Sequence, residues 1–260
     1  MALASRVAMI TGAASGLGRS TAMRFAAAGA RVVMLDLPSD ALEAAAEDVQ
    51  RAAASAGSVV ACGADVTSAD DVSAAIKAAA DLGGVNAVVQ CAGIAPPAKL
   101  VGKKGAHDLA LFEKVLRVNT VGTFNVMRLA AEAMQKGSGV GSTEERGCII
   151  NTASIAAFEG QVGQCAYSAS KGAVVALTLP AARELARSGI RVNVIAPGLM
   201  GTPMMQGLPE KVQVDLAATV PFPSRLGDPD WYAQLAEHII NNPYINGEVM
   251  RIDGGLRMSA

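Results

Sequence analysis

The sequence predicts an α/β fold in which a single doubly wound parallel sheet of about seven strands carries helices on both faces. Short apolar runs rich in valine and isoleucine alternate with longer amphipathic stretches along the chain. The apolar runs are continuous, as expected for strands that are buried on both faces of a sheet. Because no repeat or linker interrupts the alternation, we expect one domain over residues 1–260.

The expected elements follow one another in strand–helix order. We expect strands at residues 6–11, 30–36, 58–64, 85–91, 147–153, 190–196 and 248–252. We expect helices at residues 16–29, 39–56, 68–82, 108–135 and 166–187. The second of these helices begins at Ser39, a residue type that caps helix N-termini.

Three further segments are expected to be irregular loops. They span residues 95–107, 137–146 and 197–229. Long loops inside a compact domain are usually functional or mobile. The segment 197–229 carries several prolines and glycines around a short helix near residues 209–219, and we expect it to cover the substrate.

Composition and charge exclude several classes of partner. Aromatic residues make up only 3% of the 260 residues, too few for a surface that stacks single-stranded nucleic acid. The net charge is −1 and there is no basic run, so we expect no nucleic-acid partner. No apolar run is long enough to span a bilayer, so we expect no membrane partner either.

The remaining composition concerns the compartment and metals. The first expected strand begins at residue 6, so we expect no signal or transit peptide and a cytoplasmic location. The four cysteines lack a C-x-x-C spacing and the two histidines stand alone. We therefore expect free thiols and no metal site.

A glycine-rich turn follows the first expected strand. Residues 11–18 read T-G-A-A-S-G-L-G and lead directly into a helix. Glycines at positions 12, 16 and 18 keep side chains away from the turn, and the helix N-terminus favours an anion. Such a motif alone could be an ordinary tight turn, but its place between a strand and a helix predicts binding of a dinucleotide pyrophosphate by Gly12, Ser15, Gly16, Leu17 and Gly18.

The identity of the dinucleotide is predicted by Asp36, at the end of the second expected strand and 18 residues after Gly18. A carboxylate there accepts hydrogen bonds from the adenosine ribose and repels a 2′-phosphate. No lysine or arginine follows it at once, and Ser15 stands where a cationic residue could reach a phosphate. Both features favour NAD over NADP, although Asp36 could also be a simple strand-end cap.

A catalytic set is predicted in the second half of the chain. Residues 167–171 read Y-S-A-S-K, which places Tyr167 and Lys171 on one face of a helix. We expect the lysine ammonium, together with a positively charged nicotinamide, to lower the pKa of Tyr167 so that it acts as the base. Ser154 lies just after the fifth expected strand, 13 residues before Tyr167, and Asn119 lies within the long helix. We expect Ser154 to orient a substrate hydroxyl and Asn119 to support a proton relay.

These motifs together resemble those of the short-chain dehydrogenases/reductases, over the whole chain. The matches include the glycine turn, Asp65-Val66, C-A-G at 91–93, and A-P-G at 196–198. More narrowly, the chain is similar to the type 2 3-hydroxyacyl-CoA dehydrogenases, also called type 10 17-beta-hydroxysteroid dehydrogenases. That similarity rests on L-D-L-P at 35–38, F-E-G-Q-V-G-Q at 158–164 and V-P-F-P-S-R-L-G-D-P at 220–229.

The resemblance implies further site residues and a Rossmann-type fold. It implies Asp65 and Val66 near the adenine, Cys91 and Gly93 near the cofactor ribose, and Pro197 and Met200 near the nicotinamide. It also implies Gln161 and Gln164 near the substrate. The wider family often has Asn where this chain has Cys91, and Pro180 would break a simple helix.

The resemblance favours an (S)-3-hydroxyacyl-CoA as substrate. The alternatives are an NAD-linked hydroxysteroid or other secondary-alcohol dehydrogenase, a 3-oxoacyl-carrier-protein reductase, and a non-catalytic NAD-sensing scaffold. Lys103 and Lys104, in the loop 95–107, could hold the phosphates of coenzyme A or could simply be solvated. The resemblance also implies a homotetramer built through helices 108–135 and 166–187, which carry small apolar residues such as Ala130 and Ala176.

Overall fold

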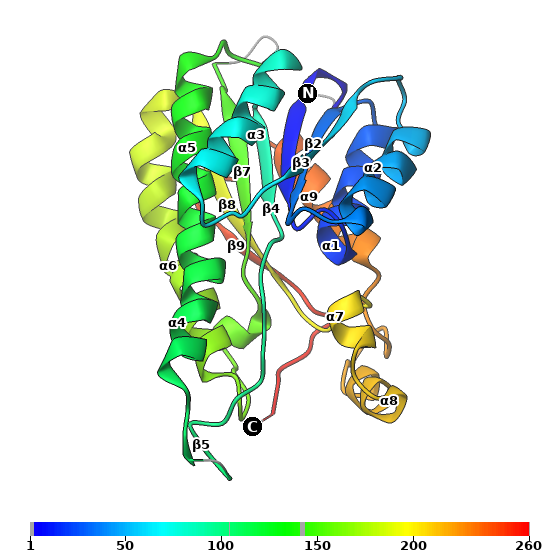
Figure 1. The fold of residues 1–260 in the computed structure, drawn as a ribbon, viewed down its shortest axis with the longest axis vertical. Helices are drawn as coiled ribbons and strands as arrows, with labels where there is room; N and C mark the ends of the chain where they lie inside the picture. Colours follow the sequence, from blue (N-terminus) through cyan, green and yellow to red (C-terminus); the bar gives the residue numbers. More distant parts are fainter. Residues whose placement is uncertain (1–2, 104, 141–143, 260) are drawn as a thin grey trace.

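The fold is a seven-stranded parallel sheet covered by helices on both faces, as predicted. A computed structural model describes residues 3–103, 105–140 and 144–259. The strands, in the order in which they lie side by side, are β3 (Val59–Gly63), β2 (Arg31–Asp36), β1 (Val7–Thr11), β4 (Ala87–Gln90), β7 (Gly147–Thr152), β8 (Ile190–Pro197) and β9 (Val249–Ile252). Every neighbouring pair is parallel (Figure 1).

The helices form a layer on each side of this sheet. One layer holds α1 (Gly16–Ala27), α2 (Asp40–Ala52) and α9 (Pro229–Asn241). The other holds α3 (Ala69–Asp81), α4 (Leu109–Leu116), α5 (Thr123–Lys136) and α6 (Cys165–Leu185). Within β1, Ala8 and Ile10 pack toward the first layer, while Val7 and Met9 pack toward the second. This explains why the apolar runs of the strands are continuous rather than alternating.

The long helix expected at residues 108–135 contains an irregular turn. A π-helical segment, Arg117–Gly122, joins α4 to α5, and Asn119 lies within it. By contrast, α6 continues without interruption through Pro180. π-helical turns of this kind are frequent at functional sites, which agrees with the importance that the sequence assigns to Asn119.

Some elements were not predicted. Helix α9 was missed although Asp228 caps it through the Asp230 N–H and Pro229 occupies its first turn. Its buried residues follow helical spacing: Tyr232, Ala233, Ala236, Ile239 and Ile240. The expected loops also contain a small hairpin, β5 (Val101–Gly102) and β6 (Gly105–Ala106), and the short helix α7 (Pro203–Gln206). Helix α8 (Glu210–Ala218) agrees with the short helix expected near residues 209–219. Short 3₁₀ turns lie at Leu3–Ser5, Ile155–Ala157 and Ala186–Ser188.

A buried ion triad closes the amino edge of the sheet. Glu145 accepts from Arg6 at 2.6 Å and from Arg191 at 2.9 Å, and all three side chains are nearly inaccessible. Arg191 also donates to the carbonyls of Ile239 and Ile240 at the end of α9. This network ties β1, β8 and α9 together at the edge opposite the one where the glycine turn lies.

Candidate active site

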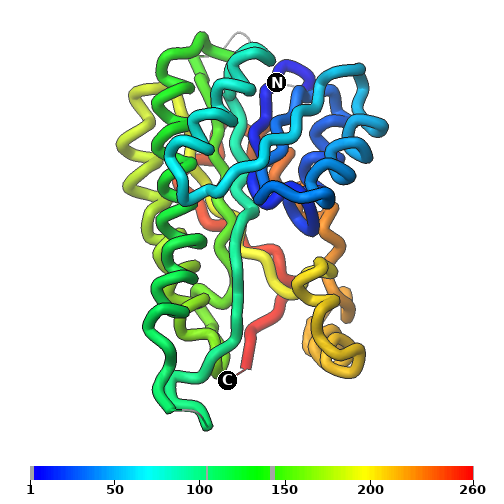
Figure 2. Tube along the Cα trace, in the orientation of Figure 1, coloured from blue at the N-terminus to red at the C-terminus, as the bar shows by residue number. Residues whose placement is uncertain are grey.

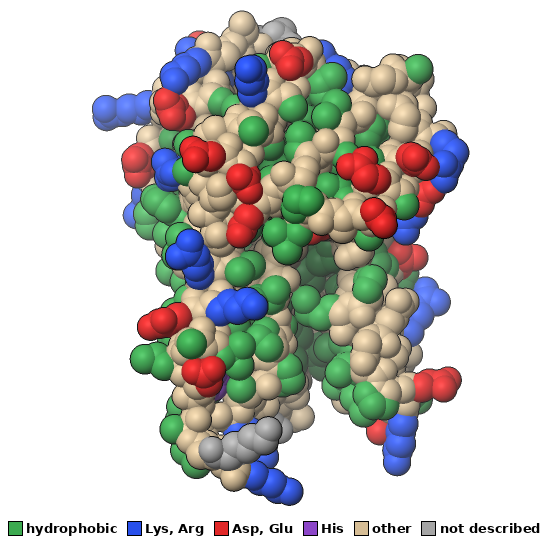
Figure 3. Space-filling model, in the orientation of Figure 1, with side chains coloured by type: hydrophobic (Ala, Val, Ile, Leu, Met, Phe, Trp, Pro, Cys, Tyr) green, Lys and Arg blue, Asp and Glu red, His purple; other side chains and the backbone are tan. Residues whose placement is uncertain are grey.

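The predicted site residues gather at the carboxyl edge of the sheet. The strand order reverses between β1 and β4, and in such sheets ligands bind in the crevice outside this switch point. Beyond this edge, the chain extends as the hairpin β5–β6 on one side and α7–α8 on the other (Figures 1 and 2). Figure 3 shows a hollow between these two parts, with hydrophobic side chains on both of its walls.

The glycine turn owes its shape to close backbone approaches. A Cβ atom on Gly12 would lie 2.7 Å from the Ala92 nitrogen, just after β4, and Gly12 has a positive φ of 65°. A Cβ atom on Gly18 would lie 2.2 Å from the Gly12 carbonyl oxygen. Glycine at these two positions lets the turn lie against β4 and lets α1 begin tightly against the turn.

The N-terminus of α1 is left without a side-chain cap. Ser15 is its N-cap residue, but the Ser15 side chain accepts no hydrogen bond from the first turn. Most of the other long helices are capped, by Ser39, Ser68, Asp108 and Asp228. The first N–H groups of α1 are therefore left without a side-chain acceptor, which suits an anion, and the pyrophosphate contact stays a prediction.

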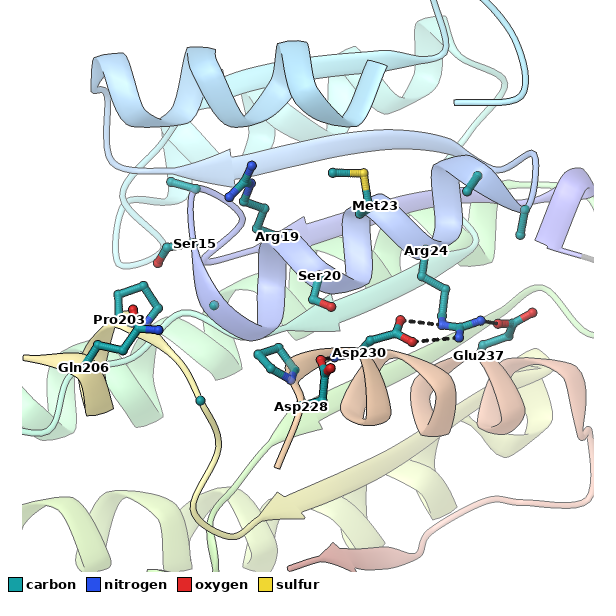
Figure 4. A pocket seen from close by; sticks show the side chains of 16 residues that line it. Ser15, Arg19, Ser20, Met23, Arg24, Pro203, Gln206, Asp228, Asp230 and Glu237 are labelled. Atoms are coloured by element: carbon teal, nitrogen blue, oxygen red, sulfur yellow. Dashed lines mark hydrogen bonds and ion pairs between the residues drawn. The ribbon is translucent and has the colours of Figure 1, made fainter. Parts of the chain in front are cut away.

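A surface cavity of about 1090 Å³ extends from this turn along α1 and α9 (Figure 4). Ser15 and Gly16 lie at one end of it. At the other end Arg24 forms ion pairs with Asp230 at 2.8 Å and Glu237 at 3.0 Å. Because carboxylates surround that far end, only the Ser15 end suits a phosphate.

Asp36 lies beside the glycine turn and supports it. Its carboxylate accepts from the Ala14 N–H at 3.0 Å and from the Leu37 N–H at 2.8 Å. Carboxylate oxygens have about four acceptor sites, so this geometry leaves capacity for a ribose hydroxyl. The Asp65 carboxylate accepts from the Thr67 N–H and closes its own turn, and the Val66 carbonyl accepts from Asn125 at 2.9 Å.

Tyr167 and Lys171 meet Ser154 above the ends of β4 and β7. The Lys171 ammonium lies 5.7 Å from the centre of the Tyr167 ring and donates to the Thr152 carbonyl at 2.7 Å. Ser154 follows β7 and begins the turn Ile155–Ala157, where its hydroxyl accepts from the Ala156 N–H. The Ser154 side chain also hydrogen-bonds Tyr167. The three residues predicted from the sequence are therefore brought together.

Burial shifts both titrating groups toward their neutral forms. It lowers the pKa of Lys171 from 10.5 to about 8, and the lysine is 4% exposed. Burial also raises the pKa of Tyr167 above its usual 10, against a smaller lowering by the Ser154 hydrogen bond. Among the protein groups desolvation dominates, and the expected lowering of the Tyr167 pKa by Lys171 together with a bound nicotinamide stays a prediction.

Asn119 is a scaffold for this site. Its amide holds both backbone groups of Ile94, at 2.8 and 2.9 Å, and donates to Ser170 at 2.9 Å. The backbone carbonyl of Asn119 accepts from the Thr123 hydroxyl at 2.8 Å. A Cβ atom on Gly93 would lie 3.2 Å from the Asn119 amide oxygen and 3.5 Å from the Lys171 nitrogen. Glycine at position 93 therefore lets Asn119 and Lys171 approach the chain after β4.

Several predicted ligand contacts fall on side chains that are already engaged. The Cys91 sulfur points at Tyr232 and Thr152, and burial raises the pKa of its thiol to about 11. Met200 is buried against the core, and Pro197 ends β8 in register with Ile252. For these residues, the backbone is the part left for a cofactor.

The predicted substrate residues occupy the rim. The Gln164 side chain accepts from the Gln161 N–H at 3.0 Å, and the Gln161 side chain donates to the Ser259 carbonyl at 3.0 Å. Lys103 is exposed in the turn of the β5–β6 hairpin, whereas Lys104 lies outside the described residues.

Sequence reasoning missed a set of contacts that binds the C-terminal segment to the loop before α6. Glu159 pairs with Arg251 at 2.9 Å and accepts from the Met258 N–H at 3.0 Å. These contacts, with the bond from Gln161 to Ser259, hold the C-terminal segment against the loop that precedes α6. Glu159 and Arg251 carry opposite charges but lie 92 positions apart, so no local pattern pairs them.

Comparisons with known proteins agree with this geometry. The sequence profile described as short chain dehydrogenase matches residues 6–213. The chain is 55% identical to 3-hydroxyacyl-CoA dehydrogenase type-2 of Homo sapiens and 54% identical to that of Bos taurus, each over 97% of this chain and 95% of the relative. A crystal structure of 3-hydroxyacyl-CoA dehydrogenase type-2 from Mycobacterium avium superposes with a TM-score of 0.90 at 40% identity, covering 98% of this chain and 97% of that one.

None of the helices in the described part of the chain is both long and apolar enough to cross a bilayer. The cytoplasmic location expected from the sequence stays a prediction.

The burial of Lys171 predicts a gain in stability when its charge is removed. The unfolded chain keeps the lysine protonated up to about pH 10.5, whereas the folded protein releases the proton near pH 8. The cost of burying the charge is therefore complete below pH 8 and disappears as the pH rises toward 10.5. Lys171→Met should raise the free energy of unfolding at pH 7 by up to about 3 kcal/mol.

Urea denaturation at pH 7 and pH 10 measures this difference. The difference in free energy of unfolding between Lys171→Met and the unsubstituted protein should be smaller at the higher pH. Lys77→Met, at an exposed lysine of α3, is the matched control and should show no such gap. A Lys171→Met protein that is less stable at both pH values would contradict the assigned cost of burial.

Proposed function

The chain belongs to the short-chain dehydrogenase family, and on that premise we propose that it oxidises the hydroxyl of a 3-hydroxyacyl-CoA to a 3-oxoacyl-CoA with NAD. The observation that carries the chemistry is the convergence of Ser154, Tyr167 and Lys171 beside an uncapped glycine turn. The substrate class is supported by relatives named 3-hydroxyacyl-CoA dehydrogenase type-2, which are 50–55% identical to this chain.

The residues at the carboxyl edge fit a nicotinamide dinucleotide. The free N–H groups of the turn suit its pyrophosphate, and Asp36 suits the adenosine ribose of NAD. Asp65 and Val66 would border the adenine, Cys91 and Gly93 a ribose, and Pro197 and Met200 the nicotinamide. When bound, NAD supplies the ring that accepts a hydride from the substrate carbon.

The proposed roles of the protein groups follow from their positions. The Tyr167 oxygen accepts the proton of the substrate hydroxyl, and Ser154 donates to the oxygen on which carbonyl character develops. Lys171, held by the Thr152 carbonyl, brings a positive charge near the Tyr167 ring, and together with a bound, positively charged nicotinamide it would favour the phenolate form against the desolvation that opposes it. Asn119 fixes the chain after β4 around this group.

Two other enzyme activities use the same chemistry. A hydroxysteroid or other secondary-alcohol dehydrogenase differs only in its pocket, and a 3-oxoacyl-carrier-protein reductase is disfavoured by Asp36 if it requires NADPH. An NAD-sensing scaffold would need no catalytic set. Initial rates with NAD against a panel of 3-hydroxyacyl-CoAs and hydroxysteroids separate these alternatives.

The proposed base is tested by Tyr167→Phe. The phenyl ring keeps the packing but has no oxygen to accept a proton, so kcat should fall at least about 100-fold while NAD still binds. Steady-state rates and cofactor titration measure the two effects, and Tyr244→Phe, at a fully exposed tyrosine, is the matched control. If Tyr167→Phe kept more than about a tenth of kcat, its oxygen would contribute less than about 1.4 kcal/mol and the role would be wrong.

The proposed cofactor is tested at Asp36. Asp36→Ala removes both the charge and the support of the glycine turn, whereas Asp36→Asn keeps an acceptor for the Ala14 or Leu37 N–H group. Both changes should weaken NAD binding and allow NADP to bind, with the turn better preserved in the asparagine variant. Titration of NAD and NADP into each protein measures the preference. If the ratio of the NAD and NADP affinities were unchanged in both variants, Asp36 would not contact the adenosine ribose.

The proposed CoA contact is tested on the hairpin. Replacing Lys103 and Lys104 with alanine should raise the KM for an acyl-CoA several-fold, because each lysine cation outside a buried site attracts a phosphate only weakly. The effect should shrink at high salt and be absent for an uncharged steroid alcohol. Lys77→Ala is the control for loss of a surface charge. Equal changes for both substrates would mean that these lysines are only solvated.

The proposed homotetramer is supported by apolar residues left exposed over α4–α6. Ala130, expected at this interface, is instead fully buried on the sheet. Larger exposed side chains are Leu109, Val121, Phe124 and Leu179. Light scattering at micromolar concentration should therefore give the mass of four chains, and Phe124→Glu should lower it. A monomeric mass for the unsubstituted protein would contradict the proposal.

A further inference from the structure

A small ring of hydrogen bonds lies beneath the active site. The Thr152 hydroxyl lies 2.7 Å from the Tyr232 hydroxyl, and the Cys91 sulfur lies 3.7 Å from Tyr232 and 3.8 Å from Thr152. The three residues come from the end of β7, from α9 and from the chain just after β4. Tyr232 is fully buried and lies 80 positions from Thr152.

The donors of this ring form a closed circuit. Cys91 donates to Tyr232 and Thr152 donates to Cys91, so the remaining bond is completed by Tyr232 donating to Thr152. Each group then donates once and accepts once. Burial raises the pKa of Cys91 to about 11 and that of Tyr232 well above 10, so all three protons are present at neutral pH.

The ring is joined to the catalytic set through a single residue. The Thr152 side chain belongs to the ring, while its carbonyl accepts from Lys171 at 2.7 Å. The Lys171 ammonium also lies near the Tyr167 ring and interacts electrostatically with the Cys91 thiol, and a Cβ atom on Gly93 would lie 3.5 Å from it. A shift of the Thr152 backbone would move the acceptor of this buried cation, and the hydroxyl contacts of Thr152 oppose such a shift.

We propose that Tyr232 is a positioning residue, which fixes the Thr152 carbonyl and through it the Lys171 ammonium from the opposite face of the sheet. This inference rests on the proposed dehydrogenase function. Phenylalanine would fill the same space but would leave the Thr152 hydroxyl without its shortest partner. Because α9 directly follows the segment 197–229, the contact also anchors the end of that segment to the catalytic set.

Kinetics of four single variants test the positioning. Tyr232→Phe and Thr152→Val should each lower kcat about ten-fold, because a small displacement of a catalytic group is costly, with little change in the KM for the alcohol. Thr152→Ser keeps the hydroxyl and should retain kcat within about two-fold. Tyr244→Phe, at an exposed tyrosine, is the matched control and should be unchanged. Melting temperatures identify any variant that fails to fold.

A double variant tests whether Tyr232 and Thr152 act on kcat through their mutual contact or independently. If both residues act through one contact, Tyr232→Phe combined with Thr152→Val should lower kcat no further than either change alone. Decreases that multiply, or a full kcat in Tyr232→Phe, would overturn the proposal.

A titration of labelled lysine side chains by NMR requires no turnover. In Tyr232→Phe the pKa of Lys171 should fall further below about 8, because a looser carbonyl stabilises the ammonium less. An unchanged pKa would overturn the positioning role even if the protein oxidised no alcohol. Inactivity of the unsubstituted protein on every secondary alcohol would instead refute the proposed function.

Discussion

The burial of one lysine ammonium, held by a backbone carbonyl at the end of β7, is the constraint around which this site is built. Lys171 lies on α6, but its charge is satisfied at the sheet, by Thr152. The cost of that burial lowers its pKa to about 8. The neighbouring features serve this arrangement: Gly93 leaves space beside the cation, and Asn119 fixes the adjoining chain.

The two edges of the sheet divide the tasks of stability and chemistry. At the amino edge, the Arg6–Glu145–Arg191 triad pairs buried charges of opposite sign, and Arg191 also donates to the end of α9. At the carboxyl edge, the N–H groups of α1 stay uncapped and the lysine stays without a carboxylate among its described hydrogen-bond partners. The stability that the triad adds at the amino edge offsets the cost of leaving N–H groups uncapped and a lysine buried at the carboxyl edge, where a ligand could pair with them.

The sequence predicted the strands well because apolar runs between glycines identify strands that are buried on both faces. It also identified Ser154, Tyr167 and Lys171, whose types and spacing are local. It missed α9, despite the cap at Asp228, and it missed Tyr232, whose partner lies 80 positions away across the sheet. It also gave no sign that burial raises the pKa of Tyr167, since desolvation depends on packing that spacing does not reveal.

The uncapped helix and the buried cation have one physical consequence in common. Each is a local cost to the folded protein that an anionic, hydroxyl-rich ligand would reduce, the helix through a phosphate and the lysine through a ribose. A ligand that does both binds the folded chain and not the unfolded one, so it stabilises the fold by mass action. A nicotinamide cofactor that filled both positions would therefore recover, as affinity, free energy that the fold gives up at its carboxyl edge.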